Sequence, residues 1–297
     1  MSTAPAPRAG WDSGRVDLSS LRLRPGPVDL ASHPTSGSPW FDGDKAAGKE
    51  ALATVAAELS DLQERLVATG RSHGAGAPSV LLVLQGMDTS GKGGTVRKVF
   101  GLLDPQGVRV ASFGAPTPDE LTHDFLWRVA PRLPGPGQVG VFDRSHYEDV
   151  LVARVRSLAP PEEIERRYGA INDFEAGVRA GGTRLVKVLL HISPDEQRSR
   201  LLARLDDPAK HWKFSPADID DRALWADYQR AYEVALERTH REDAPWYVVP
   251  AGSKWYRNLV VAQLLRDELR ALDLSWPSAS FDPDEQRRRL TEQDPLA

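Results

Sequence analysis

Residues 79–95 constrain the fold of this chain more than any other segment, because they join an apolar run to a glycine-rich loop and a helix signal. The run SVLLVLQ at 79–85 is short, almost wholly apolar and bounded by Pro78 and Gly86. Such a run is typical of a strand buried on both faces of a parallel sheet. The sequence GMDTSGK follows it and matches the G-x-x-x-x-G-K pattern of Walker A phosphate loops. A parallel α/β fold with an anion site at the end of this strand is therefore expected.

The glycines and the lysine of this loop explain how it would bind phosphate. Glycine lets backbone N–H groups turn inward around a polyanion, and the following helix presents its positive N-terminus to the same anion. Lys92 adds a mobile charge that can follow a transferred phosphoryl group. An ordinary glycine-rich turn is the alternative, and the position between a strand and a helix argues against it. The predicted phosphate ligands of the loop are Gly86, Gly91, Lys92, Gly93, Gly94 and Thr95.

The loop departs from the Walker A pattern at one position. After the lysine the pattern requires Ser or Thr, whose hydroxyl binds Mg²⁺, but this chain has Gly93 there. Thr95 lies two residues further on, which is a long reach. A metal ion would then need carboxylates, and Asp88 inside the loop is well placed by sequence. Mg²⁺, with Mn²⁺ as the alternative, is the expected cofactor.

A second acidic strand end follows at VGVFD, residues 139–143. A carboxylate at the carboxyl end of a buried strand points into the crevice where α/β sheets bind ligands, so Asp143 is a second candidate metal ligand. Arg144 beside it could clamp a phosphate through its forked guanidinium. A helix N-cap is the alternative role for Asp143, and the phosphate loop upstream favours metal or base chemistry.

Apolar periodicity and turn residues divide the rest of the chain into alternating strands and helices. Further strands are expected at 107–113, 139–143, 183–192 and 246–249. Helices are expected at 45–69 (ended by Gly70), 95–103, 118–129, 147–156, 162–179, 194–205 and 255–272. This alternation predicts a three-layer α/β fold, with a parallel central sheet between two layers of helices.

Three segments lie outside this pattern. Residues 1–43 are rich in Pro, Gly and Ser and are expected to form an extended arm that is at most partly ordered. Residues 44–275 form the expected phosphotransferase domain, and 276–297 a C-terminal tail. Within the domain, the polar stretch 206–221 carries Lys210 and Lys213 between two helices. It is interpreted as a helical lid, with a plain surface loop as the alternative.

Composition narrows the setting and the partners. The net charge of −4 makes a generally basic nucleic-acid binder unexpected, although a local basic groove is compatible with it. The absence of cysteine excludes disulfides and thiolate chemistry and fits a reducing cytoplasm. No apolar run reaches the roughly 18 residues of a membrane span, and the N-terminus lacks a signal-peptide core. A cytoplasmic protein without nucleic-acid or membrane partners is expected.

Four blocks of the sequence together resemble the polyphosphate kinase 2 family. They are the phosphate loop at 86–95, FDRSHYEDVLVARV at 142–155, ARLDDPAKHWKF at 203–214 and APWYVVPAGSKWYRNLVV at 244–261. The resemblance runs in register over about 44–272, and the combination separates this chain from ordinary nucleotide kinases, which share only the loop.

The resemblance implies an activity. Members of the family reversibly transfer the terminal phosphoryl group of inorganic polyphosphate to a nucleoside mono- or diphosphate. They depend on Mg²⁺, have a thymidylate-kinase-like P-loop fold with a lid, and are usually homo-oligomers, often tetramers, with a dimer as the other expectation. The combination of Asp143, His146 and Glu148 resembles the subgroup that uses both AMP and ADP, whereas other subgroups have Asn at the position of Glu148.

These expectations assign roles to named residues. The loop and Lys92 would hold the donor phosphates, Asp88 and Asp143 would hold the metal, and Asp88 could also position the acceptor phosphate. Arg144 and Glu148 are expected at the nucleotide. Further cations that would clamp phosphates or follow the polyphosphate chain are Arg154, Arg200, Arg204, Lys210 and Lys213. For each of these arginines, an ordinary solvated helix surface is an equally good interpretation.

Two other functions are compatible with the loop. An ATP-dependent nucleoside monophosphate kinase would share the loop and lid, but it needs an adenine site for its donor that no motif here specifies. A regulator that binds nucleotides or polyanions without turnover is the non-enzymatic alternative. The presence of Asp88, Lys92 and Asp143 argues against such a degenerate site.

Overall fold

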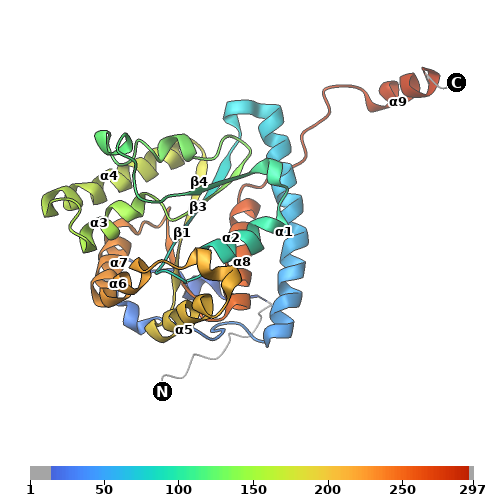
Figure 1. The fold of residues 1–297 in the computed structure, drawn as a ribbon. Coiled ribbons are helices and arrows are strands. Elements are labelled where there is room, and N and C mark those ends of the chain that lie inside the picture. Colours follow the sequence, from blue (N-terminus) through green and yellow to red (C-terminus); the bar gives the residue numbers. More distant parts are fainter. Residues whose placement is uncertain (1–14, 294–297) are drawn as a thin grey trace.

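A computed structural model describes residues 15–293 and has a five-stranded parallel sheet at its centre (Figure 1). The strand order is β2-β3-β1-β4-β5, so the strand that leads into the phosphate loop is central. The strands are β1 (Ser79–Gln85), β2 (Val108–Ser112), β3 (Val139–Asp143), β4 (Thr183–His191) and β5 (Trp246–Pro250). The prediction of a three-layer α/β fold with a parallel sheet is confirmed.

Two layers of helices cover the sheet and enclose two separate cores (Figure 1). On one face lie α1 (Lys45–His73), α2 (Lys92–Val99) and α8 (Lys254–Arg270), and on the other α3 (Val152–Val155), α4 (Pro161–Ala180) and α7 (Trp225–Thr239). Side chains of β1 alternate between the cores: Leu82 and Leu84 pack with the first group and Leu81 and Val83 with the second. This alternation is why the strand has no polar face.

Three helix expectations need correction. Helix α1 continues through Gly70 to His73, and the glycine serves a close approach instead: a Cβ there would lie 2.7 Å from the Cα of Gly137. Residues 118–129 contain the 3-10 turn Glu120–Thr122 and further turns but no α-helix. The reason is local, because the carboxylate of Asp124 accepts from the N–H of Leu126 and the side chains of Thr117 and Glu120 bond to each other's backbone N–H. The helix expected at 147–156 is a 3-10 turn, His146–Asp149, followed by the short α3.

The described part of the N-terminal arm, residues 15–43, packs more closely than its weak apolar periodicity suggests. It runs beside β5, where the N–H of Leu23 donates to the carbonyl of Trp246 and the N–H of Val248 donates to Leu21, both at 2.9 Å. Leu21 and Leu30 are fully buried, one in each core. The arm therefore completes the sheet edge that β5 would otherwise expose.

Helix α5 (Pro194–Leu205) leads into the expected lid, which contains a 3-10 helix (Pro208–Lys213) and most of α6 (Ala217–Ala223). At the other end of the chain, α9 (Pro283–Glu292) buries no residue and lies apart from the sheet (Figure 1). Among the described residues, no helix combines the length and apolar character needed to cross a membrane.

Candidate active site

The phosphate loop joins the carboxyl end of β1 to α2, as the sequence predicts, but α2 spans Lys92–Val99 instead of the expected 95–103. Gly86 and Gly91 have φ angles of 147° and 106°, in the region that favours glycine, and Thr89 is held at 66°. Lys92 is buried, and its ammonium donates to the carbonyls of Gly86 at 2.6 Å and Met87 at 3.3 Å. Its side chain therefore folds back over the loop.

The charge state of Lys92 reflects this setting. Burial lowers its pKa and the neighbouring Arg144 lowers it further, and this outweighs the opposing effect of Asp88 and Asp143. A phosphate bound in the loop would supply the negative charge that favours the ammonium form.

Asp143 reaches the same loop because β3 pairs with β1. Parallel pairing places it opposite Leu84, two residues before Gly86. A Cβ on Gly93 would lie 3.4 Å from the Asp143 carboxylate, at Oδ2. The position where the Walker A pattern requires a hydroxyl therefore borders a carboxylate instead. This contact supports Asp143 as the substitute ligand, although its role as a metal ligand stays a prediction.

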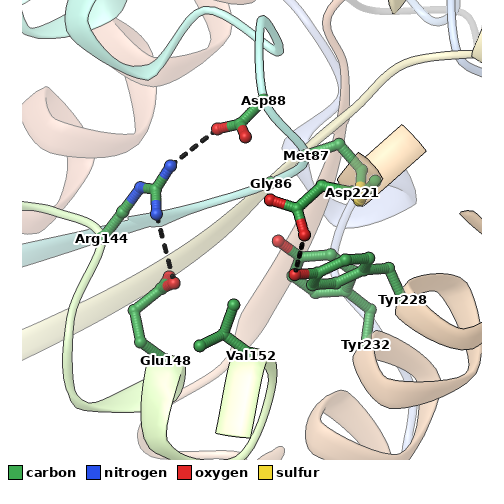
Figure 2. Close-up of a pocket in the computed structure, with 9 residues that line it drawn as sticks. All are labelled: Gly86, Met87, Asp88, Arg144, Glu148, Val152, Asp221, Tyr228 and Tyr232. Carbon is green, nitrogen blue, oxygen red and sulfur yellow. Dashed lines mark hydrogen bonds and ion pairs between the residues drawn. The ribbon is translucent and has the colours of Figure 1, made fainter. Parts of the chain in front are cut away.

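Arg144 lies between two carboxylates (Figure 2). Its guanidinium donates to Asp88 Oδ1 at 2.7 Å and pairs with Glu148 Oε2 at 3.5 Å. Burial opposes its charge, but Glu148 and Asp88 raise its pKa above the usual value. The backbone of Arg144 has a φ of 65°, in the left-handed region that is strained for a residue other than glycine. Such strain is typical of functional sites.

Burial raises the pKa of Glu148, because the loss of hydration disfavours the ionised carboxyl more than the charges of Arg144 and Lys92 favour it. The carboxyl of Glu148 therefore binds a proton more readily than a glutamate carboxyl in water.

A pocket opens beside this triad, and two tyrosines of α7 form its opposite wall (Figure 2). The hydroxyl of Tyr228 donates to Asp221 Oδ1 at 2.8 Å, while Tyr232 is buried and its pKa lies well above the usual value because of that burial. The pocket thus combines a charged end suited to phosphate with an aromatic side suited to a flat ring. The lining residues are Gly86, Met87, Asp88, Arg144, Glu148, Val152, Asp221, Tyr228 and Tyr232.

Sequence reasoning missed the aromatic half of this pocket. Tyr228 and Tyr232 are spaced four residues apart, so they share a helix face, and that spacing is the one signal that could have indicated them. Asp221 was placed at the end of the expected lid without any role.

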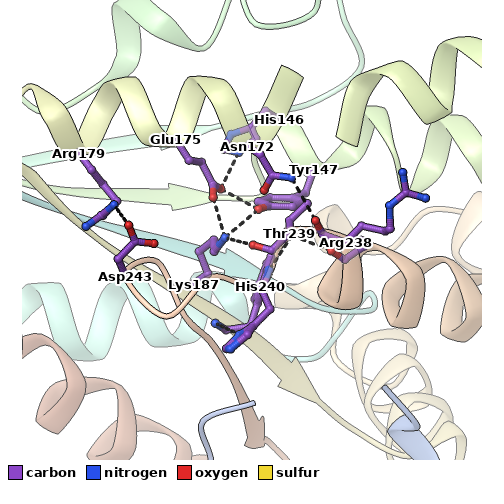
Figure 3. Close-up of polar contacts among 12 residues, drawn as sticks. His146, Tyr147, Asn172, Glu175, Arg179, Lys187, Arg238, Thr239, His240 and Asp243 are labelled. Carbon is purple, nitrogen blue, oxygen red and sulfur yellow. Dashed lines mark hydrogen bonds and ion pairs between the residues drawn. The ribbon is translucent and has the colours of Figure 1, made fainter. Parts of the chain in front are cut away.

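A buried polar network holds the segment that follows Asp143 and Arg144 (Figure 3). Glu175 of α4 accepts from the hydroxyl of Tyr147 at 2.7 Å and from the ammonium of Lys187 at 2.6 Å, and its Oε1 lies 3.3 Å from Nε2 of His146. Lys187 also donates to the carbonyl of Thr239 at 2.7 Å. Burial raises the pKa of Glu175, but Lys187 and His146 together hold it below the usual value. The network therefore joins α4, β4 and α7 to His146 and Tyr147, in the segment that follows Arg144.

The remaining predicted cations lie outside the pocket lining. Arg154 is half-exposed and lies 3.7 Å from Glu165. Arg204 donates to the carbonyl of Lys213 at 2.7 Å, and Lys210 pairs with Asp207 at 2.6 Å. Their predicted role in binding polyphosphate stays a prediction.

Arg200 has a different environment, on the outer side of the phosphate loop. Its guanidinium donates to the carbonyls of Thr89 at 2.8 Å and Ala251 at 2.7 Å, and it pairs with Glu196 at 2.6 Å. These contacts connect α5, the loop and the end of β5. They occupy the guanidinium donors that Arg200 would use to bind phosphate directly. The contact of Arg200 with phosphate stays a prediction.

Comparison with known proteins gives consistent matches. The family model described as Polyphosphate kinase 2 (PPK2) matches residues 42–275. The AMP/ADP-polyphosphate phosphotransferase of Meiothermus ruber is 47% identical over 261 residues, which cover 88% of this chain and 96% of that protein. The ADP-polyphosphate phosphotransferase of Rhodopseudomonas palustris is 43% identical over 265 residues, covering 85% and 89%. Among solved structures, polyphosphate kinase 2 from Arthrobacter aurescens TC1 is 50% identical, with a TM-score of 0.91 over 96% of this chain and 100% of that one.

Proposed function

Because the chain belongs to the polyphosphate kinase 2 family, we propose that it reversibly transfers the terminal phosphoryl group of inorganic polyphosphate to AMP or ADP. The observation that carries the proposal is that two sites adjoin at the carboxyl ends of the strands. One is the phosphate loop with Lys92, and the other is the pocket that Arg144 lines. One suits a polyanionic donor and the other a nucleotide with a phosphate and a flat base.

The loop side of the site binds the donor in this proposal. Backbone N–H groups at the start of α2 and the ammonium of Lys92 neutralise the terminal phosphates of polyphosphate. Lys92 leaves the carbonyls of Gly86 and Met87 as the phosphates arrive, and its lowered pKa recovers in their field.

The pocket side binds the acceptor. Arg144 already has carboxylates on both sides, so an incoming phosphate competes with Asp88 and Glu148 for a guanidinium that is in place. Tyr228 and Tyr232 flank the space left for the base. Phosphoryl transfer then depends on holding donor and acceptor in line, since an acceptor phosphate is largely ionised at neutral pH.

Asp88 and Asp143 would hold the divalent cation. Among the described residues no cluster of three or more His, Cys, Asp or Glu is arranged for a metal, but Mg²⁺ is commonly bound by one or two carboxylates together with phosphates and water. The open side of Gly93 beside the Asp143 carboxylate fits this arrangement. When bound, Mg²⁺, or Mn²⁺ in its place, neutralises charge on the phosphates.

Several finer assignments belong to the same proposal. Arg154, Arg204, Lys210 and Lys213 would contact the distal polyphosphate chain, with 206–221 as the lid. A homo-oligomer, tetramer or dimer, and a cytoplasmic location are likewise proposed, as is the division into an arm at 1–43, a domain at 44–275 and a tail at 276–297.

One assay tests the function. AMP and ADP are supplied separately with polyphosphate and Mg²⁺, with ATP as the competing donor for AMP, and the products are separated by nucleotide chromatography. Polyphosphate-dependent formation of ADP and ATP supports the proposal, and transfer only from ATP would assign the alternative kinase. Lys92→Ala and Asp143→Asn should each lower turnover roughly 100-fold or more while the protein stays folded. Near-normal turnover in either variant refutes the assignment of that residue.

A further inference from the structure

Arg257, in the first turn of α8, lies against the outer side of the phosphate loop, and neither the pocket nor the predicted cations include it. Its side chain is almost completely buried, at 3% exposure. The guanidinium donates from Nη1 to the carbonyl of Ser90 at 3.3 Å, and from Nε and Nη2 to the side chain of Asn258 at 3.1 and 2.9 Å.

The contact with the loop is close enough to dictate its sequence. A Cβ on Gly91 would lie 1.8 Å from Nη1 of Arg257, and one on Gly94 would lie 3.4 Å from Nη2. The guanidinium therefore fills the space that a side chain at Gly91 would take, next to the N-terminus of α2, and it borders Gly94. Gly91 serves this packing as well as the backbone conformation of the loop.

The charge of Arg257 is not compensated locally. Within residues 15–293 it forms no ion pair with a carboxylate, in contrast to Arg200, which pairs with Glu196 on the same side of the loop. Burial, and to a smaller extent the charge of Arg200, lowers the pKa of Arg257 to about 10. Both arginines donate to the carbonyl of Ser90, at 3.1 and 3.3 Å.

A buried cation without a counter-ion destabilises the free protein, and an anion close by offsets that cost. The near anion in the proposed function is the donor's terminal phosphates, which bind on the inner side of the same loop. A positive charge behind the loop adds to the field of the helix N-terminus, and the pull on the carbonyl of Ser90 fixes the orientation of the peptide that follows.

We propose that Arg257 is a positioning residue for the polyphosphate donor, acting through Ser90 and the loop backbone without touching the phosphates. This inference rests on the proposed function. It predicts that the charge of Arg257 contributes to donor binding and not to the stability of the free protein.

The test compares three variants with the wild type in the full chain. Arg257→Met keeps most of the volume without the charge, Arg257→Lys keeps the charge without the fork, and Arg200→Met serves as the structural comparison. Melting temperature is measured alone and with inorganic polyphosphate, and kcat and KM for polyphosphate are measured with saturating AMP.

Arg257→Met should melt no lower than the wild type when free, lose most of the polyphosphate-induced rise in melting temperature, and raise KM for polyphosphate roughly 10-fold with a smaller change in kcat. Arg257→Lys should restore part of the rise. Arg200→Met should instead melt lower when free, because the backbone carbonyls of Thr89, Ala251 and Gly252 lose the guanidinium that donates to them.

Two results overturn the inference while leaving the function intact. In the first, the Arg257→Met protein keeps the full polyphosphate-induced rise in melting temperature. In the second, the Arg257→Met or the Arg257→Lys protein is destabilised or unfolded when free, as a structural role of Arg257 requires. If polyphosphate does not stabilise the wild-type protein, and the wild-type protein does not phosphorylate AMP with it, the proposed donor and this inference both fail.

Discussion

The ion pair of Lys187 and Glu175 lies inside the protein and gives the sharpest test of how the Asp143 segment is held. Lys187 Nζ lies 2.6 Å from Glu175 Oε2, and the two side chains are 0% and 4% exposed. Removing one partner of such a pair leaves an uncompensated buried charge and costs about 3–5 kcal/mol. With an unfolding entropy of about 2.1 cal/mol/K per residue, the 297 residues give about 0.6 kcal/mol/K. Lys187→Met should therefore lower the melting temperature by about 5–8 °C.

The assay is a double-mutant cycle followed by circular dichroism. Glu175→Leu alone should destabilise the protein by a similar amount, whereas the combined Lys187→Met and Glu175→Leu protein should melt no lower than either single variant, because no charge then remains buried. The matched control is the half-exposed pair of Arg238 and Glu165, where Glu165→Gln should cost less than about 1 kcal/mol.

Two outcomes would refute this reasoning. If the single variants lost less than about 1 kcal/mol, the pair would not carry buried charge in solution. If the double variant lost the sum of the two single losses, Lys187 and Glu175 would act independently, and the hydroxyl of Tyr147 and the carbonyl of Thr239 would account for the stability instead.

Further predictions concern packing, the loop and pH. Gly48→Ala should destabilise the protein by about 1–3 kcal/mol in urea unfolding, because the added Cβ would lie 2.1 Å from Trp255; an unchanged midpoint refutes the tight contact of α1 with α8. Gly91→Ala should abolish the polyphosphate-induced rise in melting temperature, since the Cβ would displace Arg257 and the φ of 106° disfavours alanine; a normal rise contradicts this. Burial lowers the pKa of His191 from 6.5 to about 4, so the unfolded chain takes up the proton first and stability falls as pH drops between these values. His191→Gln should remove up to about 3 kcal/mol of that fall, measured as the difference between urea midpoints at pH 7 and pH 4, and an equal fall in both proteins refutes it.

The central strand and the loop were predictable because their signals are local. The apolar run of β1 ends at the glycine of the loop, and both are set by a short stretch of sequence. The same holds for β3 and its terminal Asp143. The helix expected at 118–129 failed for an equally local reason, since short polar side chains bond to nearby N–H groups and close turns in place of a helix.

The partners at the site were not predictable, because they come from segments far apart in the chain. Nothing in the sequence pairs Asp88 with Arg144, which are 56 residues apart, and nothing assigns Tyr232 to the same pocket. Arg257 is the extreme case: it stands among apolar residues of α8, where periodicity predicts only burial. Its role depends on the crossing of α8 behind a loop that begins at Gly86.

The register of β1 and β3 links these features into one argument. Because Asp143 pairs with Leu84, its carboxylate reaches the first turn of α2, where Gly93 leaves room for it. A serine or threonine at Gly93 would restore the usual hydroxyl and would place it beside this carboxylate. In the proposed function, the metal ligand missing from the loop is therefore supplied from the neighbouring strand. The same reasoning extends to the other side of the loop, where Gly91 leaves room for Arg257. The glycines of this loop thus lie against a carboxylate on one side and a guanidinium on the other, and both groups are proposed to act on the phosphates that the loop would bind.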